Sequence, residues 1–365
     1  MSVHIHEHPQ WPAFRWDAAA VQPTLAPLSR KRDRILGRME GLGLALRDEA
    51  GLRTLTLDVV SSSEIEGEAL NPAQVRSSIV RRLGLDAQFA DANVRSNRQI
   101  DGVVAVMVDA THSARAPLTA ERLYRWHSSL FPQSARIRVG AWRTEPIQVV
   151  SSRLDRTIVY FEGPEPDRVS REMDAFLRWF EHDDGADGIL RSAIAHLWFV
   201  TIHPFEDGNG RLGRAIADMV LARFEGIPQR FYSMSAQILR EQKAYYLILE
   251  RTQRGNLDIT EWLSWFMAGF DSALNHVDTV LDIILRKSRF WNHYAGVAMQ
   301  QREVKMLNAV LDGHVDVLTS SKWAKMTQCS HDTALRDIQR LVGMGVLQSG
   351  EEGGRSTRYL LSDFG

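Results

Sequence analysis

One run of twelve residues constrains this chain more than any other segment. It reads His203-Pro204-Phe205-Glu206-Asp207-Gly208-Asn209-Gly210-Arg211-Leu212-Gly213-Arg214. Apolar residues recur at helical spacing over 189–202 and again over 210–224, so the run is predicted to join two helices. Backbone N–H groups at the start of the second helix form a site for an anion. Arg211 and Arg214 lie three residues apart on one face of that helix, where both can reach a bound phosphate.

Two other interpretations of this run are weaker. A calcium-binding loop needs glycine at its sixth position and glutamate at its twelfth. Counted from Asp207, Arg211 takes the fifth position and Asp218 the twelfth, which does not fit. A plain connection between two helices would explain the glycines, but not the histidine, the aspartate and both arginines together. A phosphate-handling turn accounts for all of them.

The run resembles the signature of the Fic family, His-x-Phe-x-(Asp/Glu)-Gly-Asn-Gly-Arg-x-x-Arg, and every fixed position matches. The resemblance implies an enzyme, a protein adenylyltransferase, which moves AMP from ATP to a Ser, Thr or Tyr hydroxyl of a target protein or of itself. A P-loop nucleotidase is not expected, because the chain has no Gly-x-x-x-x-Gly-Lys-Ser/Thr sequence.

The resemblance also implies roles for individual residues. His203 would be the general base, for which a histidine is suited because its ordinary pKa of about 6.5 lies near working pH. Asp207 would hold Mg²⁺ between the α- and β-phosphates. Arg211 would bind the β-phosphate and Arg214 the γ-phosphate. The remaining predicted nucleotide-binding residues of the motif are Phe205, Gly208, Asn209 and Gly210.

A second segment resembles the inhibitory motif of Fic proteins, Ser/Thr-x-x-x-Glu-Gly/Asn. It reads Ser62-Ser63-Glu64-Ile65-Glu66-Gly67. Ser62 and Glu66 are four residues apart on one helix face, so Glu66 can pair with Arg214 and occupy the arginine that a γ-phosphate needs. The alternative is a capping box at the beginning of a helix, since Ser63-x-x-Glu66 fits that pattern. The Fic signature in the same chain favours the inhibitory interpretation.

Two further features surround the motif. Residues 137–152 break the helical periodicity and carry β-branched side chains around a turn, which predicts a short hairpin. In Fic proteins such a hairpin, the flap, holds the target segment as an added strand. Tyr245 and Tyr246 resemble the family's helical tail, where one tyrosine borders the adenine; the alternative is that both belong to the core.

The predicted fold is mainly α. It comprises an N-terminal helical region with the inhibitory motif (1–115), a helical catalytic core with the small hairpin (116–290), and a C-terminal winged helix-turn-helix (300–365). Helices are predicted at 319–326 and 330–342, with Ser330 as N-cap, followed by strands at 346–348 and 357–361. Residues 301–365 contain eight Lys/Arg and eight Asp/Glu, so DNA binding is possible but not favoured, and protein contact is the alternative.

Composition and charge bear on the expected partners and location of the protein. The net charge of −1 indicates no general attraction to nucleic acid or membrane, and no apolar stretch is long enough to span a bilayer. A single cysteine, Cys329, is typical of a cytoplasmic protein. A homo-oligomer is possible. Two alternatives remain for function: an AMP-removing phosphodiesterase of the same fold, in which Glu66 would activate water, or a nucleotide-sensing transcriptional regulator acting through the winged helix.

Overall fold

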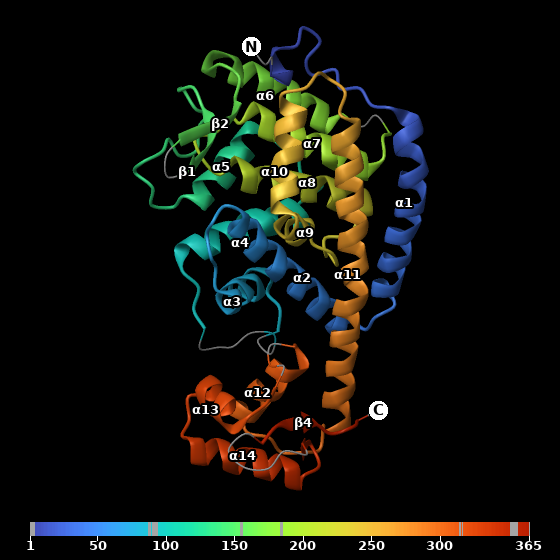
Figure 1. The fold of residues 1–365 in the computed structure, drawn as a ribbon, viewed down its shortest axis with the longest axis vertical. Coiled ribbons are helices and arrows are strands. Elements are labelled where there is room, and N and C mark those ends of the chain that lie inside the picture. Colours follow the sequence, from blue (N-terminus) through green and yellow to red (C-terminus); the bar gives the residue numbers. More distant parts are fainter. Residues whose placement is uncertain are drawn as a thin grey trace. The chain divides into compact units, whose positions relative to one another are not determined.

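A computed structural model gives the architecture of the chain (Figure 1). The described residues are 4–86, 89, 94–153, 156–182, 185–313, 315, 317–350 and 357–364, and for 150–153 and 156–160 the backbone alone is described. These residues are mostly helical, with two small antiparallel hairpins, so the predicted mainly α fold is confirmed. No helix among them is long and apolar enough to cross a membrane.

The chain folds as two compact units, Met1–Val277 and Asp278–Gly365. Within the first unit, helices from both sides of residue 115 pack together: α2 lies against α9, and α4 against α8. The second unit begins before residue 300. The domain limits drawn from the sequence stay predictions.

The first unit contains a short 3₁₀ helix, a hairpin and most of the α-helices. They are η1 (Ile5–Glu7), α1 (Ala18–Glu40), α2 (Leu44–Ile65), α3 (Pro72–Leu83), α4 (Arg98–His112), α5 (Ala120–Leu130), β1 (Gln148–Arg153), β2 (Arg156–Glu162), α6 (Pro166–Glu181), α7 (Gly188–Ile202), α8 (Asn209–Glu225), α9 (Met234–Arg240), α10 (Gln242–Gln253) and the first part of α11 (Thr260–His293).

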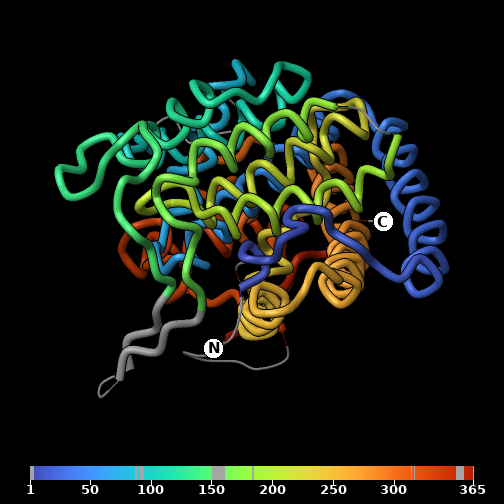
Figure 2. Tube along the Cα trace, turned by 90° about the horizontal axis from the view of Figure 1, so that it is seen from above, coloured from blue at the N-terminus to red at the C-terminus, as the bar shows by residue number. Residues whose placement is uncertain are grey.

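Helices α7 and α8 form the centre of this unit and lie side by side in both views (Figures 1 and 2). Residues of α7 are buried on all its faces, as expected for a helix that is apolar all round. Gly213 allows α8 to approach closely, because a Cβ there would lie 2.7 Å from Cγ1 of Val200. The two predicted helices are confirmed, and the motif spans the turn between them and the first residues of α8.

The end of α2 carries the predicted inhibitory motif. The side chains of Ser61, Ser62 and Ser63 are buried there, and Glu66 is the C-cap. The capping-box alternative is therefore wrong, because α2 begins after Gly43 and its N-terminus is far from this segment in the chain. Asp58, one turn earlier, accepts hydrogen bonds from the Ser233 hydroxyl and from a backbone N–H at the start of α9, which holds α2 in the core.

The hairpin lies later in the chain than predicted. β1 and β2 pair from Gln148↔Glu162 to Arg153↔Arg156, whereas most of the predicted range, 137–147, has no regular structure. The prediction for 137–147 was wrong because β-branched residues around 137–139 favour a strand locally. In the structure that segment is held by contacts with the motif rather than by strand pairing. Arg143, for example, bonds to Pro204 and His203.

The second unit contains the rest of α11, α12 (Gln301–Leu311), α13 (Ser320–Thr327), α14 (His331–Gly343), β3 (Leu347–Ser349) and β4 (Tyr359–Leu361). An isolated antiparallel bridge joins Leu318 to Tyr359, beside the β3–β4 pair. The winged helix-turn-helix stays a prediction. The predicted helices, strands and N-cap are confirmed, since the Ser330 side chain accepts a bond from the Thr333 N–H. The turn between the strands, 351–356, lies outside the described residues.

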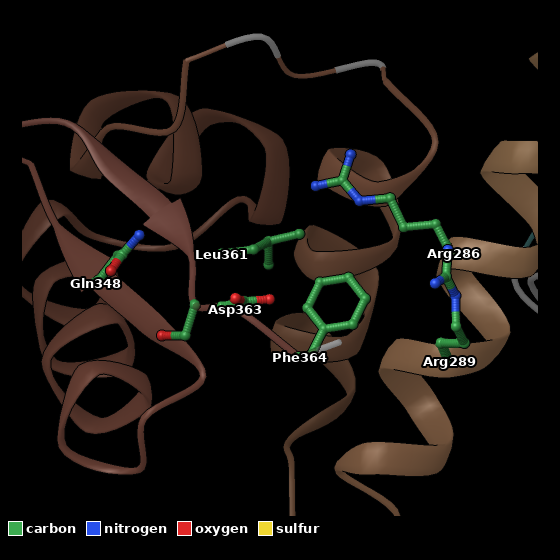
Figure 3. Close-up of a pocket in the computed structure, with 7 residues that line it drawn as sticks. Arg286, Arg289, Gln348, Leu361, Asp363 and Phe364 are labelled. Atoms are coloured by element: carbon green, nitrogen blue, oxygen red, sulfur yellow. The ribbon is translucent and has the colours of Figure 1, made fainter.

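This unit has its own core around Trp323, and a cavity of about 380 Å³ beside β3 and β4. The cavity is lined by Arg286, Arg289, Gln348, Leu361, Ser362, Asp363 and Phe364 (Figure 3). It contains none of the predicted site residues, which all belong to the first unit.

Candidate active site

His203 follows the last residue of α7 in an unusual conformation. Its φ of 50° and ψ of 58° place it in the left-handed region, which residues other than glycine rarely adopt. Its N–H bonds to Phe199 O at 3.0 Å, and its Nδ1 lies 3.0 Å from Val200 O. A carbonyl oxygen only accepts, so Nδ1 carries the hydrogen and Nε2 keeps its lone pair. The imidazole is held in the tautomer that a general base at Nε2 needs.

The surroundings also favour the neutral form of this ring. Burial lowers the pKa of His203, and the charge of Arg143 lowers it further. The hydrogen bond to Val200 O and the carboxylates of Glu66 and Asp207 raise the pKa, but the net change is still a lower pKa. His203 is therefore unprotonated at neutral pH.

The turn after His203 is closed by its own side chains. Asn209 accepts a bond from the Phe205 N–H at 3.0 Å and donates to Phe205 O at 2.8 Å. Both residues are buried, and the Phe205 ring stacks on His127 with 4.2 Å between ring centroids. Asn209 and Phe205 thus support the turn, and direct contact of either with a nucleotide stays a prediction.

His127 is a residue of this site that the sequence analysis missed. Its Nε2 donates to Asp207 O at 3.2 Å, and its Nδ1 accepts from the Gly140 N–H at 2.9 Å. Burial lowers the pKa of His127 to about 4, so it stays neutral and keeps both bonds. Its only sequence signal is a place on the apolar face of α5, which any core residue would share.

The beginning of α8 has the geometry of an anion site. Gly208 is its N-cap at a φ of 78°, and a Cβ there would lie 2.9 Å from a ring carbon of Phe131. A Cβ at Gly210 would overlap with Oε1 of Glu66. The Gly208 N–H donates to Oδ1 of Asp207 at 2.6 Å, and Asp207 is exposed. Both glycines are therefore required by the local backbone and by close neighbours.

Both arginines of the motif are engaged by the end of α2. Arg214 donates to the Ser62 hydroxyl at 2.9 Å, to Ser62 O at 2.7 Å and to Oε1 of Glu66 at 2.8 Å. Arg211 donates to Oε2 of Glu68 at 2.8 Å. The guanidinium groups are 2% and 4% exposed, whereas Glu66 and Glu68 are 32% and 33% exposed. The structure thus brings Ser62, Glu66 and Arg214 together as the spacing indicated, and adds Glu68, which the sequence analysis did not single out.

The two tyrosines lie on different sides of α10. Tyr245 is buried with its hydroxyl 2.9 Å from Nε2 of His196, and burial raises its pKa. Tyr246 is 43% exposed and donates to Ile65 O at 3.3 Å, beside the inhibitory motif. An adenine contact by either tyrosine stays a prediction; the exposed Tyr246 is the better placed of the two.

These features combine a turn between two helices, two arginines at the start of the second helix and a histidine whose Nε2 lone pair is free, an arrangement suited to binding an anion. Residues 117–221 match the family model described as Fic/DOC family, and the chain therefore contains a Fic/DOC domain. Residues 4–85, which include the end of α2, match a separate model described as Domain of unknown function (DUF4172).

Curated relatives are similar over part of the chain. A relative named Protein adenylyltransferase Fic, from Drosophila sechellia, is 28% identical over 241 residues, which cover 64% of this chain and 44% of the relative. The chain thus spans less than half the length of that relative.

Solved structures share the fold. A Fic family protein from Desulfovibrio desulfuricans superposes with a TM-score of 0.53 at 20% identity, over 94% of this chain and 97% of that one. Fic-1 from C. elegans gives a TM-score of 0.51 at 19% identity, over 73% of this chain and 74% of that one. At these identities the likeness shows the helical fold.

Proposed function

We propose that this protein is a protein adenylyltransferase, which transfers AMP from ATP to a hydroxyl side chain of a target protein or of itself. One observation carries the proposal: Nδ1 of His203 lies 3.0 Å from Val200 O, which leaves the Nε2 lone pair free beside a helix N-terminus that carries two arginines. The relatives named protein adenylyltransferase support the same activity.

In the proposed reaction, Nε2 of His203 takes the proton of the attacking hydroxyl as its oxygen bonds to the α-phosphorus of ATP. The bond between the α-phosphorus and the bridging oxygen breaks, and pyrophosphate leaves. The fixed tautomer matters because the lone pair is already aimed when the hydroxyl arrives. Holding a base in position avoids an entropic cost during the reaction.

The N-terminus of α8 would bind the phosphates. Backbone N–H groups near Gly208 and Gly210 stabilise negative charge there, and Arg211 and Arg214 would hold the β- and γ-phosphates. Mg²⁺ fits this site because Asp207 is an exposed carboxylate, and because Mg²⁺ is usually bound by one or two carboxylates together with substrate phosphates. When bound, the ion would neutralise phosphate charge.

Two ion pairs support inhibition of the proposed enzyme by its own chain. Arg214 is paired with Glu66 and Arg211 with Glu68, so a nucleotide that needs both guanidiniums must displace two carboxylates. Glu66 and Glu68 are delivered by one turn, in which Gly67 has a φ of 81° and the Glu68 N–H bonds to Ser63 O at 3.0 Å. We infer that this turn inhibits transfer, with Glu66 acting at the γ-phosphate position and Glu68 at the β-phosphate position.

The test compares wild type with Glu66→Gly for label transfer from α-³²P-ATP and γ-³²P-ATP in cell lysate with Mg²⁺. Labelling of protein from the α-label alone, stronger in Glu66→Gly, is expected. Glu64→Gly is the matched control, because Glu64 is an exposed carboxylate of the same segment. Labelling from the γ-label would mean phosphate transfer instead. Retained ATP binding without labelling from either would favour the AMP-removing or nucleotide-sensing alternatives.

A further inference from the structure

The segment between α5 and β1 passes beside the motif without forming a helix or strand. Arg143 lies in this segment, and its side chain is 2% exposed. A buried guanidinium has five N–H groups that need acceptors. Among the described residues, its hydrogen bonds all go to backbone carbonyl oxygens, so its role differs from that of an ion-paired arginine.

One of these side-chain bonds, together with a backbone bond of Arg143, holds the peptide that follows the catalytic histidine. Nε of Arg143 donates to His203 O at 2.8 Å, and the Arg143 backbone N–H donates to Pro204 O at 2.9 Å. His203 has a left-handed φ, a conformation that costs on the order of 1–3 kcal/mol and persists only when its surroundings impose it. Arg143 supplies part of that restraint.

The other two bonds hold the hairpin. Nη1 donates to Glu145 O at 2.9 Å, on the chain entering β1, and Nη2 donates to Pro164 O, on the chain leaving β2. Gly163 closes the base of the hairpin with a bond to Ile147 O at 3.1 Å. A Cβ at Gly163 would lie 3.0 Å from Nη2 of Arg143 and 3.6 Å from Cβ of His203. The histidine and both ends of the hairpin therefore meet at one guanidinium.

We propose that Arg143 is a positioning residue that holds the imidazole of His203 in register with the β1–β2 hairpin. This inference rests on the proposed function and on the expectation from the resemblance that the hairpin holds the target segment, whose hydroxyl His203 then deprotonates. Arg143 does not touch the reacting atoms. It fixes the distance between the base and the strand beside which the target would lie.

The kinetic test uses Glu66→Gly as the parent and adds Arg143→Ala, Arg143→Lys or, as a control, Arg136→Ala, an exposed arginine of the same segment. In Arg143→Ala, kcat is expected to fall on the order of 100-fold, because a base displaced by about 1 Å loses that much. ATP affinity is expected to stay within about two-fold, since Arg143 acts on orientation rather than on phosphate binding. Added guanidinium ion should restore part of kcat in Arg143→Ala. Arg143→Lys should remain slow, because an ammonium cannot reproduce the planar fork.

Hydrogen exchange provides a readout that needs no activity. In Arg143→Ala, amides of 141–147, 163–165 and 203–206 should exchange faster, while those of α7 stay protected. Guanidinium should restore the protection. Unchanged kcat and exchange in Arg143→Ala would overturn the proposal, as would loss of ATP affinity together with protection in α7, which would mean a purely structural arginine. If the parent itself transfers nothing, the proposed function fails, and the exchange result still decides whether Arg143 links the histidine to the hairpin.

Discussion

The motif turn, 203–209, and the turn at 66–68, which we propose to be inhibitory and call the inhibitory turn, face each other but are held in opposite ways. The motif turn is closed by Asn209 and His127, which are almost fully buried and bond to backbone atoms. The inhibitory turn meets the motif through two ion pairs whose carboxylates are about one-third exposed. Because the carboxylates of Glu66 and Glu68 keep access to solvent, whereas Asn209 and His127 do not, the second turn is the one that a ligand can displace.

This difference assigns different tasks to the two regions. A buried hydrogen-bonded turn keeps one geometry, which catalysis requires. A turn attached by exposed carboxylates can be replaced by phosphates, which carry the same sign of charge and bind the same guanidiniums. The serine that also binds Arg214 belongs to the core of α2, so the arginine keeps two of its bonds when Glu66 leaves.

The largest effect is expected from removing the base. His203→Ala should lower AMP transfer by about 10²–10⁴-fold, because the proton of the hydroxyl then has no acceptor. ATP binding should remain, since the base acts in the transition state more than in the ground state. Single-turnover labelling and equilibrium ATP binding measure the two effects separately. Loss of ATP binding would instead assign His203 to the structure of the turn.

Arg214→Ala is expected to have the next largest effect. In the Glu66→Gly background it should reduce transfer by about 10²–10³-fold, because it removes a charged donor from the phosphate site. Steady-state kinetics at several ATP concentrations checks this. Unchanged kinetics would show that Arg214 serves only to bind the inhibitory turn, and the γ-phosphate role would be wrong.

Replacing the carboxylates of the inhibitory turn should raise the rate of AMP transfer. Glu66→Gln is expected to raise transfer by about 5–150-fold, the range of typical coupling between sites. Glu68→Gln should raise the rate of transfer less, because the Phe131 ring still holds Arg211. The Cζ atom of Arg211 lies 5.1 Å from the centroid of that ring. The double variant should exceed either one, as measured by initial rates of labelling. Glu64→Gln serves as the control. A double variant no faster than Glu66→Gln would remove Glu68 from the inhibitory turn.

Asn209→Ala tests the other side of the comparison. It breaks two buried bonds to Phe205, so it should lower the free energy of unfolding by about 1–3 kcal/mol. Glu68→Gln should change it by less than about 1 kcal/mol. Denaturant titrations of both variants measure this difference. Equal losses of unfolding free energy in the two variants would contradict the conclusion that the motif turn is held more firmly than the inhibitory turn.

The smallest expected effect is on pH dependence. Because burial holds the pKa of His203 below its usual value, transfer should persist through pH 6.5 and decline only on further acidification, as the ring becomes protonated. The carboxylate of Glu66 raises this pKa, so Glu66→Gln should move the acid limb of the kcat profile to still lower pH. Rate–pH profiles of both proteins check the sign. A limb that moves to higher pH would show that His203 is not the titrating base.

The sequence predicted those parts of the protein that local chemistry encodes. The helices on both sides of the motif, and those of the C-terminal unit, follow from apolar periodicity and caps within short segments. The hairpin was predicted too early, because the segment before β1 is shaped by Arg143 and its distant carbonyl partners. Strand propensity does not record such contacts.

The sequence by itself identified the histidine, the two arginines and the helix N-terminus between them as a candidate site. It could do so because these groups occupy one turn and the helix that follows it. The Glu66–Arg214 pair was accessible only through the resemblance, since 148 residues separate the two side chains. The tertiary structure alone decided that Glu68 pairs with Arg211, that His127 supports Asp207, and that Arg143 joins His203 to the hairpin. These contacts depend on which buried groups meet when helices pack, and no periodicity along the chain specifies that.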